Sequence, residues 1–234
     1  VICLSVLPVS AFAEENSNDA IRVGSFEETY NSVNEKGERR GYGYEYLQNI
    51  AGYAGWTYEY ITSNWEDCFA QLENGEIDIL GGISYTEERA KNMLFSDMPM
   101  GKEKYYIYTD ASNMDLTAVN LDSFEGKNIG VLKDYIPEDV LNEWESKYGL
   151  HTQHINVSTT TEVMDKLSKH EIDCFVSVEE SRWEESDILP ITSIGEAEIY
   201  FAINPKRPDI KEALDSAMRR IKDDNPFYTY DLYR

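Results

Sequence analysis

The sequence has few basic residues, few cysteines and few histidines, and each shortage excludes a class of function. Lys and Arg number 21 against 44 Asp and Glu, so the net charge is −23. A field of that sign repels phosphate backbones, which excludes nucleic acid as an expected partner. Three cysteines are too few for a disulfide scaffold. Three histidines, with no Cys or Glu at ligand spacing beside them, predict no metal site.

Motifs of catalysis and phosphate binding are also missing. No G-x-S-x-G elbow occurs, and the glycine pair Gly81-Gly82 is not followed by G-K-[ST]. Carboxylates are so abundant that no acidic pair stands out as catalytic. We therefore predict a protein that is not an enzyme and needs no cofactor, and we keep an enzyme as a distant alternative.

Long apolar runs are confined to the start of the chain. Residues 1–13, VICLSVLPVSAFA, are uncharged, and Ala11 and Ala13 are the small residues that signal peptidase requires. We predict that this segment is the end of a truncated signal peptide, with a buried first strand as the alternative. No later run reaches the length of a membrane span. The mature segment is therefore predicted to be extracytoplasmic.

The first part of the chain alternates strand and helix patterns. Residues 20–24 and 57–61 are β-branched or alternating, and Leu47, Ile50 and Ala54 share one helical face that ends at Gly55. A second amphipathic helix starts near Trp65 and stops at Gly75, and residues 77–80 follow as an apolar strand. This β-α-β-α-β series predicts a mostly parallel sheet with helices on both faces.

The second part repeats the plan. Residues 128–132 and 155–157 are predicted strands, and helices are predicted over residues 140–148 and after Thr160 or Thr161. The segment LENGEIDILGG at residues 72–82 is echoed by LSKHEIDCFVS at residues 167–177. Each combines a helix end, a tight turn and Glu-Ile-Asp before a strand, and the echo predicts two lobes of similar topology.

Two strands are predicted to cross between the lobes. Residues 105–108 lead out of the first lobe, residues 198–203 lead back, and a last helix follows Pro208. The prediction is an α/β fold of two lobes, each a mostly parallel sheet flanked by helices. Lobe 1 comprises residues 20–107 and 198–234, and lobe 2 comprises residues 108–197. Two crossings form a hinge, and a ligand is expected in the cleft between the lobes.

One stretch, residues 72–97, carries the chemistry. Its strand is predicted to end in Gly81-Gly82 and a hydroxyl-rich turn at Ser84, Tyr85 and Thr86, with Arg89 one short turn further on. Open backbone N–H groups beside a two-pronged guanidinium favour a small anion, most simply a carboxylate.

From about residue 20 to the end, the sequence resembles the family 3 extracytoplasmic solute-binding proteins, the receptors of amino-acid ABC importers. The resemblance implies their two-lobed fold, the periplasmic binding protein fold of type II. The most specific piece is GEIDILGGISYTEERAKNMLFSD, which matches the family pattern of G-x-I-D, S-x-T-x-x-R and F-S-D. The resemblance implies that Arg89 pairs with the ligand α-carboxylate and that Trp65 and Tyr30 pack on the ligand. It also implies polar or main-chain contacts from Ser84, Gly81 and Gly82.

The second lobe departs from the family pattern. Where family members place a hydroxyl-bearing turn after the lobe's first strand, this chain has Asp134, Tyr135 and Ile136. Where they place an aspartate for the ligand ammonium, it has Val178, followed by Glu179. The resemblance therefore supports a carboxylate ligand more strongly than an ordinary α-amino acid, with Tyr135 and Glu179 as the candidate contacts from this lobe.

The predicted function is capture of a small carboxylate-bearing ligand, an amino acid or a derivative, for ABC-type uptake through a membrane permease. The phrases GYGYEYLQNIAGYAGW and DNPFYTYDLYR also resemble the input domains of bacterial sensors. The alternative is thus a ligand-sensing domain linked covalently to a membrane signalling domain, such as a histidine kinase or diguanylate cyclase. The 17 tyrosines and four tryptophans leave a sugar or aromatic ligand as a further alternative.

Overall fold

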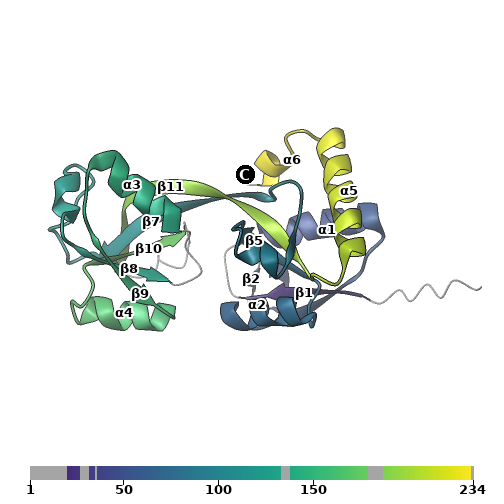
Figure 1. Ribbon diagram of the computed structural model, residues 1–234, viewed down its shortest axis with the longest axis horizontal. Coiled ribbons are helices and arrows are strands. Elements are labelled where there is room, and N and C mark those ends of the chain that lie inside the picture. The colour runs from purple at the N-terminus through teal and green to yellow at the C-terminus, as the bar shows by residue number, and fades with distance from the viewer. Residues whose placement is uncertain (1–19, 27–31, 35, 133–137, 179–186, 233–234) are drawn as a thin grey trace, which may run out of the picture.

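Two lobes connected by a pair of long strands make up the computed structural model (Figure 1). The structure describes residues 20–26, 32–34, 36–132, 138–178 and 187–232. The predicted signal segment, residues 1–13, lies outside these ranges. No helix among the described residues is long and apolar enough to span a membrane.

Lobe 1 is built on three parallel strands in the order β4-β1-β5. These are β1 (Ile21–Ser25), β4 (Tyr58–Thr62) and β5 (Ile79–Ser84), with helices α1 (Tyr42–Ala54) and α2 (Trp65–Asn74) between them. Both helices end as predicted, because Gly55 and Gly75 adopt the left-handed conformation that closes a helix C-terminus. The short strands β2 (Ser32–Val33) and β3 (Arg39–Arg40) form a separate hairpin.

Lobe 2 repeats this arrangement in the strand order β10-β8-β9, again parallel. Its elements are β8 (Asn128–Leu132), α3 (Glu138–Tyr148), β9 (Gln153–Val157), α4 (Thr160–Ser168) and β10 (Cys174–Val178). The predicted N-cap of α4 was wrong by one residue. Thr159 is the cap, and its hydroxyl accepts the backbone N–H of Glu162 at 3.1 Å.

Two antiparallel strands, β7 (Gly101–Asp110) and β11 (Ile188–Ile203), belong to both lobes and join them into one nine-stranded sheet. They pair along their length, and the predicted lobe boundaries at residues 107 and 198 fall within them. The remaining elements are β6 (Leu94–Phe95), α5 (Pro208–Asp224), α6 (Tyr228–Leu232) and two 3₁₀ turns, Arg89–Lys91 and Leu121–Phe124. The predicted fold class, a two-lobed α/β protein with two crossings, is confirmed.

The strand of the Leu72–Asp97 stretch differs from the prediction. It runs from Ile79 to Ser84, so Gly81 and Gly82 lie within it and not at its end. Together they oppose the single residue Phe201 of β11, which makes a β-bulge, and Gly82 has φ +75°. Glycine is needed here because a side chain is strained at that φ.

Candidate functional site

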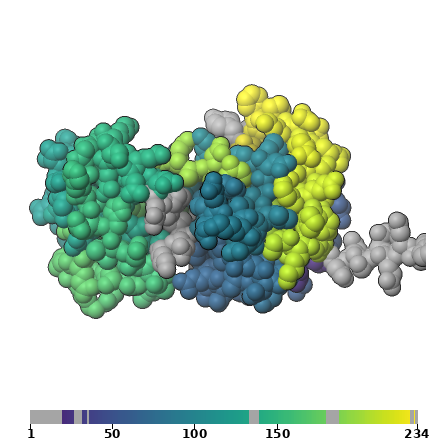
Figure 2. All heavy atoms as spheres, in the orientation of Figure 1, coloured from purple at the N-terminus to yellow at the C-terminus, as the bar shows by residue number. Residues whose placement is uncertain are grey.

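The strand register shows where the predicted cleft between the lobes would lie. The carboxyl end of β5, at Ser84, lies opposite Ile199 of β11, which in turn pairs with Gly101 at the start of β7. The carboxyl end of β10, at Val178, pairs with Tyr105 of β7. The parallel strands of both lobes therefore point toward each other across the segment from Gly101 to Tyr105. The two bodies and the strand β11 that spans them are visible in Figure 2.

Arg89 lies at the lobe 1 edge of this cleft, at the start of a 3₁₀ turn. One guanidinium nitrogen, Nη1, donates to both the main-chain oxygen and the hydroxyl of Ser84, at 2.8 and 2.7 Å. The Arg89 backbone N–H is held by the Thr86 hydroxyl at 3.1 Å. Ser84 is buried while Arg89 is only partly buried, so the structure brings this predicted pair together and fixes the arginine at the strand end.

Aromatic rings lie next to the arginine. The Arg89 guanidinium carbon is 5.1 Å from the centre of the Phe69 ring, a cation–π contact. Trp65 stands at the start of α2, with its ring 4.6 Å from Phe69 and 4.8 Å from Phe26. Sequence reasoning found Trp65 and missed Phe26 and Phe69 as neighbours of the site. The spacing of Phe69, one helical turn after Trp65, was the signal that could have found it.

Gly81 and Gly82 both make contacts within lobe 1. A Cβ on Gly81 would come within 3.3 Å of the Phe201 ring, so this residue packs against the lobe 1 core. The backbone N–H of Gly82 is buried and donates to the sulfur of Met100 at 3.1 Å. The sequence predicted a ligand contact for this N–H, but its hydrogen-bond partner lies inside the protein.

The connecting strand β7 carries a buried acid, Glu103, that was not predicted from the sequence. Glu103 and Tyr105 of β7 are 4% and 0% exposed, and the Tyr105 hydroxyl donates to Glu103 at 2.9 Å. Burial raises the pKa of Tyr105, the charge of Glu103 raises it further, and Arg89 lowers it. The alternation of Glu103, Tyr105 and Ile107 on one strand face was the available signal.

Three predicted site residues, Tyr30, Tyr135 and Glu179, lie outside the described residues, and their ligand contacts stay predictions. The neighbouring Val178 is described and is buried opposite Tyr105. Within the described ranges, no group of His, Cys, Asp and Glu side chains could hold a metal ion.

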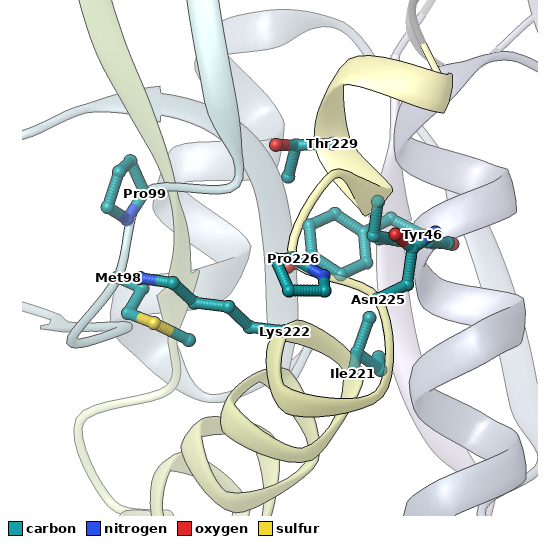
Figure 3. A pocket seen from close by; sticks show the side chains of 9 residues that line it. Tyr46, Met98, Pro99, Ile221, Lys222, Asn225, Pro226 and Thr229 are labelled. Atoms are coloured by element: carbon teal, nitrogen blue, oxygen red, sulfur yellow. The ribbon is translucent and has the colours of Figure 1, made fainter.

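A separate cavity lies on lobe 1 between α1, α5 and α6 (Figure 3). Its volume is about 190 Å³, and Tyr46, Met98, Pro226 and Tyr228 are among its lining residues. None of the predicted site residues lines it, so it is distinct from the cleft.

The two-lobed fold with an arginine at the cleft edge defines a class, the periplasmic-type binding proteins. The family model for bacterial extracellular solute-binding proteins, family 3, matches residues 21–230. The chain therefore belongs to this family, whose members bind solutes outside the cytoplasm. Among curated proteins no sequence matches significantly.

Solved structures of similar fold include proteins of two functional kinds. An ancestral arginine-binding protein bound to arginine shares 22% identity, with 92% of this chain and 96% of that chain covered and a TM-score of 0.69. The probable amino-acid ABC transporter extracellular-binding protein ytmK from Bacillus subtilis shares 18% identity, with 91% of this chain and 95% of that chain covered and a TM-score of 0.71. A histidine kinase sensor domain similar to periplasmic binding proteins shares 19% identity, with 92% of this chain and 94% of that chain covered and a TM-score of 0.70.

Proposed function

We propose that the chain captures a small carboxylate-bearing ligand, an amino acid or a derivative, between its lobes, with Arg89 as the carboxylate anchor. The observation that carries this proposal is the position of the Arg89 guanidinium. It is fixed by Ser84 at the carboxyl end of β5, next to Phe69, and on the side of lobe 1 that faces β10.

This geometry suits a carboxylate for physical reasons. Ser84 orients the guanidinium through Nη1, and a planar guanidinium matches the two oxygens of a carboxylate in a charge-assisted pair. Trp65 and Phe69 provide an apolar wall for the rest of the ligand. A ligand that contacts both lobes favours the closed arrangement only by the free energy of contacts that the open arrangement lacks.

Uptake is the role that we favour, with the chain delivering its ligand unchanged to an ABC permease. The family match and the fold shared with an ABC transporter binding protein support this role. A sensor role is the second candidate, because a histidine kinase sensor domain shares the fold at a nearly equal TM-score, 0.70 against 0.71. Permease and ATPase genes beside the gene would support uptake, and a reading frame that continues into an apolar span and a signalling domain would support sensing.

The binding proposal is tested by a thermal-shift panel of amino acids, peptides and small carboxylates, followed by calorimetry of each hit on Arg89→Gln. A charge-assisted pair contributes about 1.5 to 3 kcal/mol, so the variant is expected to bind about tenfold more weakly or worse. Arg220→Gln is the matched control, because it removes the same charge from the outer face of lobe 1, where Arg220 packs on Tyr53. Stabilisation by a neutral sugar and by no carboxylate would overturn the proposal. Turnover of the hit, followed by NMR, would overturn its non-catalytic part.

A further inference from the structure

A second arginine, Arg39, reaches the same edge of lobe 1 from the β2–β3 hairpin. Its Nη1 donates to the Ser25 hydroxyl at 2.8 Å and its Nη2 to the Thr62 hydroxyl at 3.3 Å. Ser25 and Thr62 are paired residues at the carboxyl ends of β1 and β4. The guanidinium carbon of Arg39 lies 4.2 Å above the Tyr60 ring. Arg39 is therefore held over the strand ends and not extended into solvent.

The charge of Arg39 is not neutralised by any carboxylate among the described residues. Its partners there are two hydroxyls and a ring, whereas Arg22, Arg207 and Arg219 each form ion pairs. A partly buried guanidinium with no carboxylate partner in the described part of the chain is unexpected at a net charge of −23, where carboxylates outnumber cations about two to one. A cation kept in place by neutral donors and acceptors is suited to an anion that comes from outside.

Arg39 and Arg89 flank the strand ends from opposite faces of the sheet. Arg89 lies over Phe69 of α2, and Arg39 lies over Tyr60, which packs in the cluster on the α1 face. Val23 of β1 pairs with Ile79 of β5, and the bulge at Gly81-Gly82 takes up one residue, so Ser84 extends about two residues past the level of Ser25. With strands about 4.8 Å apart and a rise of about 3.3 Å per residue, the residues that anchor the two arginines are about 8 Å apart.

We infer that Arg39 is a second anion-binding position of the cleft and that the ligand is a small dicarboxylate, such as an acidic amino acid. This inference rests on the proposed function, in which Arg89 binds the first carboxylate. Two cations held over different strand ends can be bridged by two carboxylates that are joined by a short carbon chain. Arg39 then determines specificity by recognising the distal acid.

Calorimetry on matched pairs of acid and monoamide tests the inference. The pairs are L-glutamate and L-glutamine, L-aspartate and L-asparagine, glutarate and glutaramate, and succinate and succinamate. We expect the wild-type protein to bind at least one dicarboxylate tenfold or more tightly than its monoamide. Arg39→Gln should reduce this ratio to about one while leaving monoamide affinity within a few fold, and Arg39→Lys should restore part of the ratio.

Arg40→Gln is the control, because it removes the same charge from the adjacent, exposed residue of the hairpin. If Arg39 only braces the hairpin, Arg39→Gln lowers the melting temperature without changing the ratio, and the inference fails. It also fails if no dicarboxylate is preferred by the wild-type protein, while Arg89-dependent binding of a monocarboxylate leaves the proposed function standing. If no carboxylate binds at all, both the proposed function and the inference fail.

Discussion

Arg22 surrounds the carboxylate of Asp78 with three hydrogen bonds. The backbone N–H of Arg22 donates to Oδ2 at 3.0 Å, Nε donates to the same oxygen at 2.9 Å, and Nη2 donates to Oδ1 at 2.7 Å. Asp78 is 1% exposed. Because Arg22 lies in β1 and Asp78 immediately precedes β5, this ion pair fixes the register of the two central strands of lobe 1.

Asp78→Asn is expected to destabilise the protein by about 3 kcal/mol, because it leaves the guanidinium of Arg22 without its counter-ion. Chemical denaturation followed by far-UV circular dichroism measures the change. Asp173→Asn is the matched control in lobe 2, where Asp173 accepts the backbone N–H of Asn128 at 2.8 Å but is partly exposed. It should cost about 1 kcal/mol. Equal losses in the two lobes would contradict the assigned role of the Arg22 pair.

Stability should also fall in acid through Asp78. Burial acts to raise the pKa of this carboxyl, but the hydrogen bonds from Arg22 and Asn204 outweigh it and the pKa is lowered. The unfolded chain then binds a proton more readily than the folded one, so the contribution is complete above the unfolded pKa of about 3.9. It is lost as pH falls below that value through the folded pKa. Denaturation midpoints between pH 3 and pH 6 should fall less steeply for Asp78→Asn than for the wild type.

Gly82→Ala is expected to destabilise lobe 1 by about 1 to 2 kcal/mol, since Gly82 has φ +75° within the β5 bulge. Gly52→Ala is expected to have the opposite effect on stability. Gly52 lies in α1 with no atom near its missing Cβ, and alanine there should stabilise by about 0.5 to 1 kcal/mol. Melting temperatures of the two variants test both predictions. An unchanged melting temperature for Gly82→Ala would show that the bulge tolerates a side chain.

Ser84→Ala is expected to weaken carboxylate binding by about threefold to tenfold, because Arg89 keeps its contact to the main-chain oxygen of Ser84 but loses the hydroxyl. The effect should be smaller than that of Arg89→Gln and should appear mainly in the dissociation rate. Stopped-flow binding to the best hit of the thermal-shift panel measures it. A loss as large as that of Arg89→Gln would mean that the hydroxyl itself contacts the ligand.

The fold could be predicted from the sequence because its signals are local. Helix α2 follows from the apolar spacing of Cys68 and Leu72 and from the stop at Gly75. The repeat of Glu-Ile-Asp correctly predicted two lobes. In its second copy His170 stands at the position that Gly75 has in the first, and it too has a positive φ, +56°. Gly81-Gly82 was misplaced because a bulge depends on the partner strand, and Phe201 is far away in the sequence.

The candidate site was predicted only in part. Arg89 and Ser84 lie in one continuous motif, so the pattern was readable. Arg39 lies in the polar run EKGERR, where charge usually means a solvated surface. Its partners Ser25 and Thr62 are 14 and 23 residues away, and neither hydroxyl stands out in the sequence.

The two crossing strands have a mechanical consequence. Since β7 and β11 are paired to each other through the junction, the lobes cannot approach without bending a two-stranded ribbon, which resists and stores elastic energy. The ladder is interrupted between Pro190 and Thr192 and between Ser193 and Gly195. A Cβ on Gly195 would come within 3.1 Å of Val140 in α3. Flexure should concentrate at these interruptions, so the stiffness of this part of the ribbon should affect the affinity for a ligand.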